Sequence, residues 1–96
     1  LPISATKNST SIELAWKPVP QRDLNGYLTN YVIRYTDGEE EIQRKVGRHR
    51  EEVVINGLRA STTYFFQISA ATDKGEGPRS KPTEAKTKGE RNKLNS

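Results

Sequence analysis

The chain has no cysteine and no methionine, and it has one histidine and one tryptophan. Without cysteine, neither a disulfide framework nor a thiolate metal site can form, so packing and sheet hydrogen bonds must supply the stability. The absence of cysteine therefore favours neither an oxidising nor a reducing compartment. No apolar run approaches the roughly 20 residues that cross a bilayer as a helix, and no charged-then-apolar leader opens the sequence. We expect an excised module of a longer chain.

The 96 residues include only 31% hydrophobic side chains, enough for one compact core and no second one. The sequence predicts a single domain over residues 1–88. Residues 89–96 are expected to form a polar linker or a disordered tail, because they are rich in charged and amide side chains and poor in apolar ones.

The net charge of +4 invites a nucleic-acid interpretation, but its distribution weakens it. The last eleven residues, 86–96, hold four basic residues and one acidic residue, so they account for +3. The rest of the chain is nearly neutral, and we expect no nucleic-acid partner.

Apolar and polar residues alternate along most of the chain, which is typical of strands with one buried face. The clearest segments place Ile12 and Trp16, then Tyr31 and Tyr35, on single faces. The segment from Tyr64 to Ala70 has the longest inward face, and a weak edge strand is expected near residues 80–87. No convincing helix pattern occurs. Seven short strands at this spacing favour an all-β, antiparallel sandwich of immunoglobulin-like type.

The dipeptide Asp37-Gly38 predicts a two-residue hairpin turn, because both residues tolerate positive φ. That turn would place Ile33 opposite Ile42 on the core side. It would also place Arg34 opposite Glu41 as an outward charge pair.

Four motifs occur in order: Trp16, the run Tyr31–Tyr35, the segment Gly57–Tyr64 and the glycine-rich segment Gly75–Ser80. Together they resemble the framework of a fibronectin type III domain, and the resemblance covers residues 1–88. Ala60 is the main departure, since the family usually has proline there, and a looser turn is expected.

The resemblance implies structural roles for the motif residues. Tyr64 is expected to act as a tyrosine corner, with its hydroxyl bonding back to the chain near Leu58. The expected structural core consists of seven residues: Trp16, Tyr31, Ile33, Leu58, Tyr64, Phe66 and Ile68.

The inventory for catalysis is thin, and we expect a domain that is not an enzyme and has no cofactor, metal or catalytic residue. The lone His49 lies between Arg48 and Arg50, where positive charge disfavours both a metal and a protonated ring. The carboxylates occupy adjacent positions, 39–41 and 51–52, which alternate across a strand and do not converge.

Three surfaces are candidates for binding. The first is a basic stretch that could contact heparan sulfate or an acidic partner. A solvated edge strand that carries charged residues explains this stretch equally well. The stretch consists of Arg44, Lys45, Arg48 and Arg50. The second is an outward pair, Val32 and Phe65, expected to lie side by side. The third is the loop over residues 72–78, which lacks the adhesive Arg-Gly-Asp triplet that some family members carry there.

Asn8-Ser9-Thr10 is an acceptor sequence for N-linked glycosylation in an expected exposed turn. The loop over residues 18–28 resembles loops in neuronal adhesion receptors and receptor-type tyrosine phosphatases. The resulting hypothesis is an extracellular module of a single-pass cell-surface receptor or adhesion protein. It would act as a spacer and interaction domain beside immunoglobulin or fibronectin neighbours. The alternatives are a glycosaminoglycan-binding module and an intracellular scaffold or muscle-type repeat.

Overall fold

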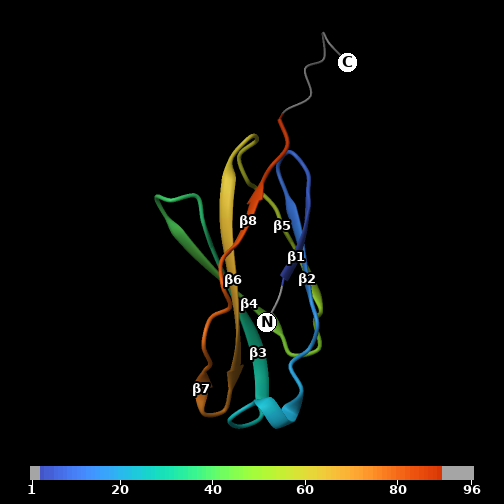
Figure 1. The fold of residues 1–96 in the computed structure, drawn as a ribbon, viewed down its shortest axis with the longest axis vertical. Coiled ribbons are helices and arrows are strands. Elements are labelled where there is room, and N and C mark those ends of the chain that lie inside the picture. The colour runs from blue at the N-terminus through green and yellow to red at the C-terminus, as the bar shows by residue number, and fades with distance from the viewer. Residues whose placement is uncertain (1–2, 90–96) are drawn as a thin grey trace.

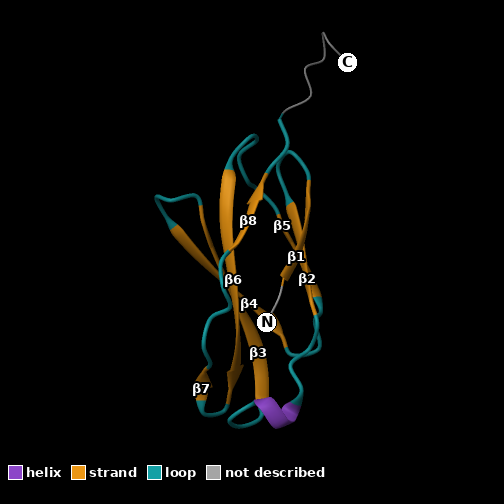
Figure 2. Ribbon diagram, viewed as in Figure 1, coloured by secondary structure: helices purple, strands orange, loops and turns teal. Residues whose placement is uncertain are grey.

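The computed structural model of the chain describes residues 3–89, which form two antiparallel sheets packed face to face (Figure 1, Figure 2). One sheet has the order β1-β2-β5, with β1 Ile3–Lys7, β2 Ile12–Trp16 and β5 Glu52–Ile55. The other has the order β4-β3-β6, with β7 and β8 both pairing with β6. Its strands are β3 Leu28–Thr36, β4 Glu41–Gly47, β6 Thr63–Thr72, β7 Gly75–Glu76 and β8 Thr83–Lys86.

The predicted all-β sandwich is confirmed. Seven strands match the expected set, and the eighth, β7, is a two-residue segment folded back on β6. A single 3-10 turn, η1 Gln21–Asp23, interrupts the loop between β2 and β3. It follows Pro20, whose fixed φ of −61° suits the start of a turn. The predicted tail lies outside the described residues apart from residue 89.

The core forms where the inward faces of the two sheets meet. On β2 the alternation of Ile12, Leu14 and Trp16 buries every second residue, as the period of two requires. The Trp16 ring meets Tyr31 of the opposite sheet edge-on, with ring centroids 5.6 Å apart. All seven residues expected in the core are buried: Trp16, Tyr31, Ile33, Leu58, Tyr64, Phe66 and Ile68.

The tyrosine corner has the predicted hydrogen bond. The backbone N–H of Arg59 donates to the Tyr64 hydroxyl oxygen over 3.0 Å, next to buried Leu58. The bond ties the β5–β6 connection to the strand that it enters. Because the ring of Tyr64 also packs in the core, the corner is fixed at both ends.

The position where proline was expected, Ala60, lies in a turn held by side-chain hydrogen bonds. The buried Thr87 hydroxyl donates to the Arg59 carbonyl over 2.6 Å and accepts from the N–H of Thr62 over 2.9 Å. Ser61 adopts a φ of 53°, a left-handed conformation that costs energy for a residue with a side chain. The chain after β8 therefore supplies the restraint that proline would supply locally.

The prediction of a two-residue turn between β3 and β4 is wrong. Tyr35 pairs with Ile42 and Arg34 with Gln43, so four residues, 37–40, make the turn rather than two. The physical reason is the Asp37 carboxylate, which accepts the N–H groups of residue 39 at 3.0 Å and residue 40 at 3.4 Å. These N–H donors also lower the pKa of Asp37. Because the register shifts by two residues, every side chain keeps its predicted face.

Strand β4 packs loosely against the sandwich. Val46 is its only buried residue, and Ile42, on the face that should meet the core, is 42% exposed. Figure 1 shows the β3–β4 hairpin splaying away from the rest of the sheet. Strands β4 and β5 lie at the edges of the two sheets, and no backbone pairing joins them.

Candidate binding surfaces

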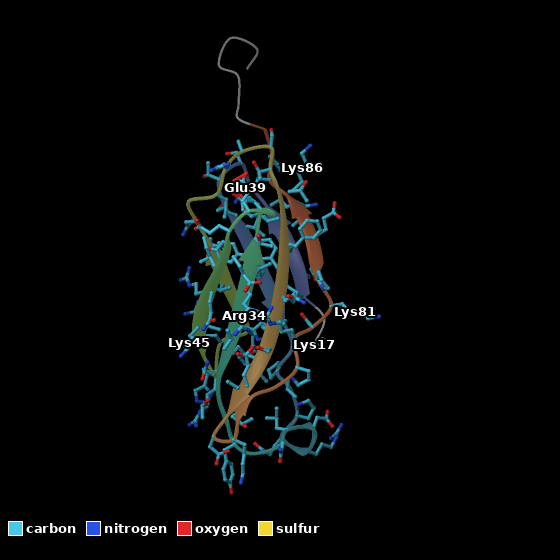
Figure 3. All side chains as sticks on the ribbon, turned by 90° about the vertical axis from the view of Figure 1, so that its left-hand side faces the viewer. Lys17, Arg34, Glu39, Lys45, Lys81 and Lys86 are labelled. Atoms are coloured by element: carbon cyan, nitrogen blue, oxygen red, sulfur yellow. The ribbon has the colours of Figure 1, made fainter. Side chains whose placement is uncertain are left out.

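The basic stretch does not form one surface. Arg44 pairs with Ile33 and so lies on the inward face of β4, whereas Lys45 pairs with Val32 on the outward face. Arg48 follows the strand in an exposed turn. Figure 3 shows Lys45 at the margin of the molecule. The alternation of a strand thus separates neighbours that look like a cluster in the sequence.

Arg44 instead bridges the two sheets. Its Nη1 donates to the Val54 carbonyl on β5 over 3.3 Å, so one guanidinium joins the edges of the two sheets. In the following turn, Nε of Arg50 donates to the carbonyl of residue 52 over 3.3 Å. Nε of Arg48 contacts Nε2 of His49 at 3.2 Å. The basic side chains that stay available on the exterior are Lys45, Arg48 and Arg50.

The predicted outward pair of Val32 and Phe65 is wrong. Val32 is only 2% exposed and pairs with Ser69. Phe65 is 40% exposed and pairs with Thr36, four residues further along β3. The two side chains are therefore not neighbours, and Phe65 is an isolated exposed ring.

A polar network on the outer face beside Val32 was not found by sequence reasoning. Arg34 makes a two-bond ion pair with Glu76, in which Nη2 donates to Oε1 over 2.7 Å. The Ser69 hydroxyl donates to the other carboxylate oxygen over 2.6 Å. The sequence feature that could have indicated this network is the turn before Gly75, because it folds Glu76 back beside β6.

This network controls the ionisation of both partners. The hydrogen bonds from Arg34 and then Ser69 lower the pKa of Glu76 to about 2. The hydrogen bond with Glu76 raises the pKa of Arg34. Ser69 is almost fully buried, and the network lies over the part of the sheet where Val32 is covered. Arg34 is labelled at the middle of this face in Figure 3.

The loop over residues 72–78 has a structural task. The Asp73 carboxylate accepts the N–H of Tyr27 over 2.8 Å, and the Asp73 N–H donates to the Tyr27 carbonyl over 3.1 Å. Gly26 has a φ of +124°, and a Cβ there would lie 2.3 Å from that carboxylate. Glycine is therefore required where the β2–β3 loop meets the β6–β7 hairpin.

Two grooves flank these elements. One of about 400 Å³ lies between the β2–β3 loop and the β6–β7 hairpin, with the 74% exposed ring of Tyr27 at the same end. The other, of about 330 Å³, lies beside the β3–β4 turn. Its lining combines tyrosine and isoleucine side chains with acidic ones: Tyr35, Ile42, Tyr64, Asp37, Glu39 and Glu40.

The remaining candidate, the glycosylation sequence at Asn8, is exposed. Asn8 lies in the turn between β1 and β2, where its Nδ2 contacts the Ser11 hydroxyl at 3.2 Å. Over residues 3–89, no group of three or more histidine, aspartate or glutamate side chains could hold a metal ion. No helix in this part of the chain is long and apolar enough to cross a membrane.

Comparison with known proteins decides the family. The profile of the fibronectin type III domain matches residues 1–86. The chain belongs to the fibronectin type III family. Contactin-3 of Mus musculus is 35% identical over 85 residues, which cover 84% of this chain and 8% of that protein. Receptor-type tyrosine-protein phosphatase F of Mus musculus is 39% identical over 90 residues, covering 85% of this chain and 5% of that protein.

Solved structures agree with this fibronectin type III assignment. The FN5 domain of Drosophila Lar shares 34% identity and a TM-score of 0.73, covering 93% of this chain and 94% of that one. The fibronectin type III domain of human contactin 1 has a TM-score of 0.81 at 24% identity, covering 95% of this chain and 77% of that one. At that identity the second comparison supports the fold alone.

The fibronectin type III domain is a non-catalytic module of cell-surface receptors and adhesion proteins such as contactins and receptor phosphatases. The word phosphatase in the relatives' names describes whole proteins, of which this chain spans only a few per cent.

The Arg34–Glu76 pair predicts a pH dependence of stability. Glu76 has a folded pKa of about 2, below its ordinary value of 4.5. The ionised Glu76 side chain therefore contributes fully to the free energy of unfolding above pH 4.5, and this contribution is lost as the pH falls toward 2. Replacing Glu76 by Gln should lower the urea midpoint at pH 7, and the difference from the wild type should shrink between pH 4.5 and 2. Urea titrations followed by circular dichroism measure this.

The matched control is Glu84→Gln on the exposed face of β8, which should leave the midpoint almost unchanged at every pH. Equal effects of the two substitutions would contradict a stabilising role for the ion pair.

Proposed function

We propose that this domain is an extracellular module of a multidomain cell-surface receptor or adhesion protein, in which it acts as a spacer and a protein-interaction domain. The observation that carries the proposal is its likeness to repeats of a contactin, of receptor-type phosphatases and of ephrin type-B receptor 3. The chain spans 4–8% of these relatives. Its neighbours in the parent would be further immunoglobulin or fibronectin domains, and the parent would cross the membrane once.

The directions of the terminal strands support the spacer role. The N–H of Lys88, just after β8, donates to the carbonyl of Asn8, just after β1, over 2.9 Å. The two strands thus end side by side and run the same way (Figure 1). A chain that enters before β1 and leaves after β8 therefore advances along the long axis of the sandwich. This arrangement suits modules joined head to tail.

The exposed groups suit a role in protein binding. Tyr27 lies at the loop end and Phe65 lies on the outer face of β6, and both rings are exposed. Aromatic rings with rigid surroundings are frequent anchors in interfaces. The hydrogen bonds between Tyr27 and Asp73 hold the backbone beneath one of these rings.

A second candidate is binding of heparan sulfate. It rests on Lys45, Arg48 and Arg50, which are exposed on the β4 edge and the following turn. Arg44, which bridges the sheets, is not needed for it. A third candidate, an intracellular scaffold or muscle-type repeat, is compatible with the absence of cysteine but leaves the glycosylation sequence at Asn8 without a role.

The extracellular assignment predicts that Asn8 carries a glycan. Its side chain is exposed in a turn outside the sheet ladders, as glycosylation requires. When the domain is secreted from mammalian cells behind a signal peptide, intact mass spectrometry should show a glycan that is absent from the Asn8→Gln variant. Asn56→Gln is the control, since Asn56 is followed by Gly-Leu and is no acceptor. A secreted domain without a glycan would count against the extracellular assignment.

The heparan sulfate candidate predicts salt-dependent retention on heparin. The double substitution of Arg48 and Arg50 by Glu should shift elution to clearly lower salt, because charge contacts on an exposed surface are screened. The control pair, Lys17→Glu with Arg22→Glu, changes the net charge equally at exposed sites on another loop. If both double variants elute at equally lowered salt, the retention depends on net charge alone, and the heparan sulfate candidate is excluded.

A further inference from the structure

Strand β4 offers a free edge that no strand of the described chain covers. It pairs along one side with β3, and no strand of residues 3–89 pairs with its other side. Six of its seven residues are exposed. Unpaired N–H and C=O groups along a strand are a ready template for another strand.

The charges on this edge are sorted by sign along the strand. Acidic residues lie just before the strand and at its first position, at Glu39, Glu40 and Glu41. Basic residues follow in its middle, at Arg44 and Lys45, and then in the turn at residues 48–50. In Figure 3, Glu39 and Lys45 are labelled at different heights along this hairpin. An edge with charge of one sign repels its own copies. An edge sorted in this way attracts an antiparallel copy, because each acidic end meets a basic end.

We propose that β4 is a self-recognition edge, through which two copies of the domain pair their β4 strands antiparallel about a twofold axis. Residues opposite each other in an antiparallel pair must lie on the same face. A register centred on Gln43 meets this condition and places Glu41 of each copy opposite Lys45 of the other. The Gln43 side chains, which carry both donor and acceptor groups, then face each other.

Neighbouring registers pair the charges of β4 less well. A pairing centred on Glu41, Arg44 or Lys45 places two like charges directly opposite each other. A pairing centred on Ile42 places Glu41 opposite Gln43 and so forms no ion pair within β4, because the glutamates at positions 39 and 40 lie in the turn before the strand. The ion pair of Glu41 with Arg79 is long, at 3.6 Å, and both side chains are about half exposed. Glu41 is therefore available for a partner charge.

The self-pairing surface is separate from the proposed extracellular role, because it depends only on the edge of β4. It also differs chemically from heparan sulfate binding, which uses the basic end alone. A second copy is favoured over a polyanion because the edge presents both signs, in an order that its own copy complements.

Charge reversal tests the pairing. Sedimentation equilibrium up to roughly 1 mM should show a weak dimer, as expected for a small interface. Glu41→Lys alone and Lys45→Glu alone should each weaken it by roughly tenfold, since two ion pairs become repulsive. An equimolar mixture of these two variants should associate again, because an edge with lysine at both positions then meets an edge with glutamate at both. Both substituted positions are exposed, and circular dichroism confirms that the fold is retained.

A single introduced cysteine tests the register, since the chain has no cysteine of its own. Gln43→Cys should form an intermolecular disulfide on mild oxidation, because the two residues lie opposite each other. Gly47→Cys is the matched control, because this exposed position has room for a side chain and takes no part in the proposed ion pairs. Its two copies would be separated by about 27 Å along the strands and should cross-link far less. A monomer at all concentrations, no recovery in the mixture, or equal cross-linking at both positions would overturn the proposal.

Discussion

The contact of Trp16 with Tyr31 is the interaction on which the rest of the molecule depends. It joins the two sheets across the core, with the rings edge to face, in a chain that has no disulfide to do so. The indole nitrogen is buried and has no hydrogen-bond partner among the described residues, so Trp16 stabilises by packing alone and incurs a desolvation cost. Burial of a ring of this size outweighs that cost.

The periphery is fixed by side-chain hydrogen bonds to the backbone. Thr87 and Tyr64 close the end at the β5–β6 corner, and Asp73 closes the opposite end. The outer face is held by Arg34 and Glu76. Both ends and one face are held in this way, whereas strand β4 combines a free edge with exposure of six of its seven residues. The candidate binding groups lie on β4, on the turn after it, at the loop tips and at Phe65 on the outer face of β6.

Features that depend on local period and on family motifs could be predicted from the sequence. The faces of β2, β3 and β6 follow from alternation, and the Tyr64 hydrogen bond follows from the tyrosine-corner motif. The turn after β3 was missed because the Asp37 side chain competes for backbone N–H groups, which alternation does not reveal. Val32 was expected to be exposed because its position on the strand is outward, but the Arg34–Glu76 pair lies beside it on that face. These two partners are 42 residues apart in the chain, too far for reasoning from a hairpin.

The most direct test of the central role of Trp16 is the free energy of unfolding of the Trp16→Ala variant, measured by urea titration with circular dichroism. The substitution should cost about 3–5 kcal/mol, a large share of the roughly 5–15 kcal/mol available to a domain of this size. The control, Phe65→Ala, removes an aromatic ring from the exposed outer face and should cost much less. A Trp16→Ala variant as stable as the wild type, or one that loses no more stability than Phe65→Ala, would show that the sheets are held together by something else.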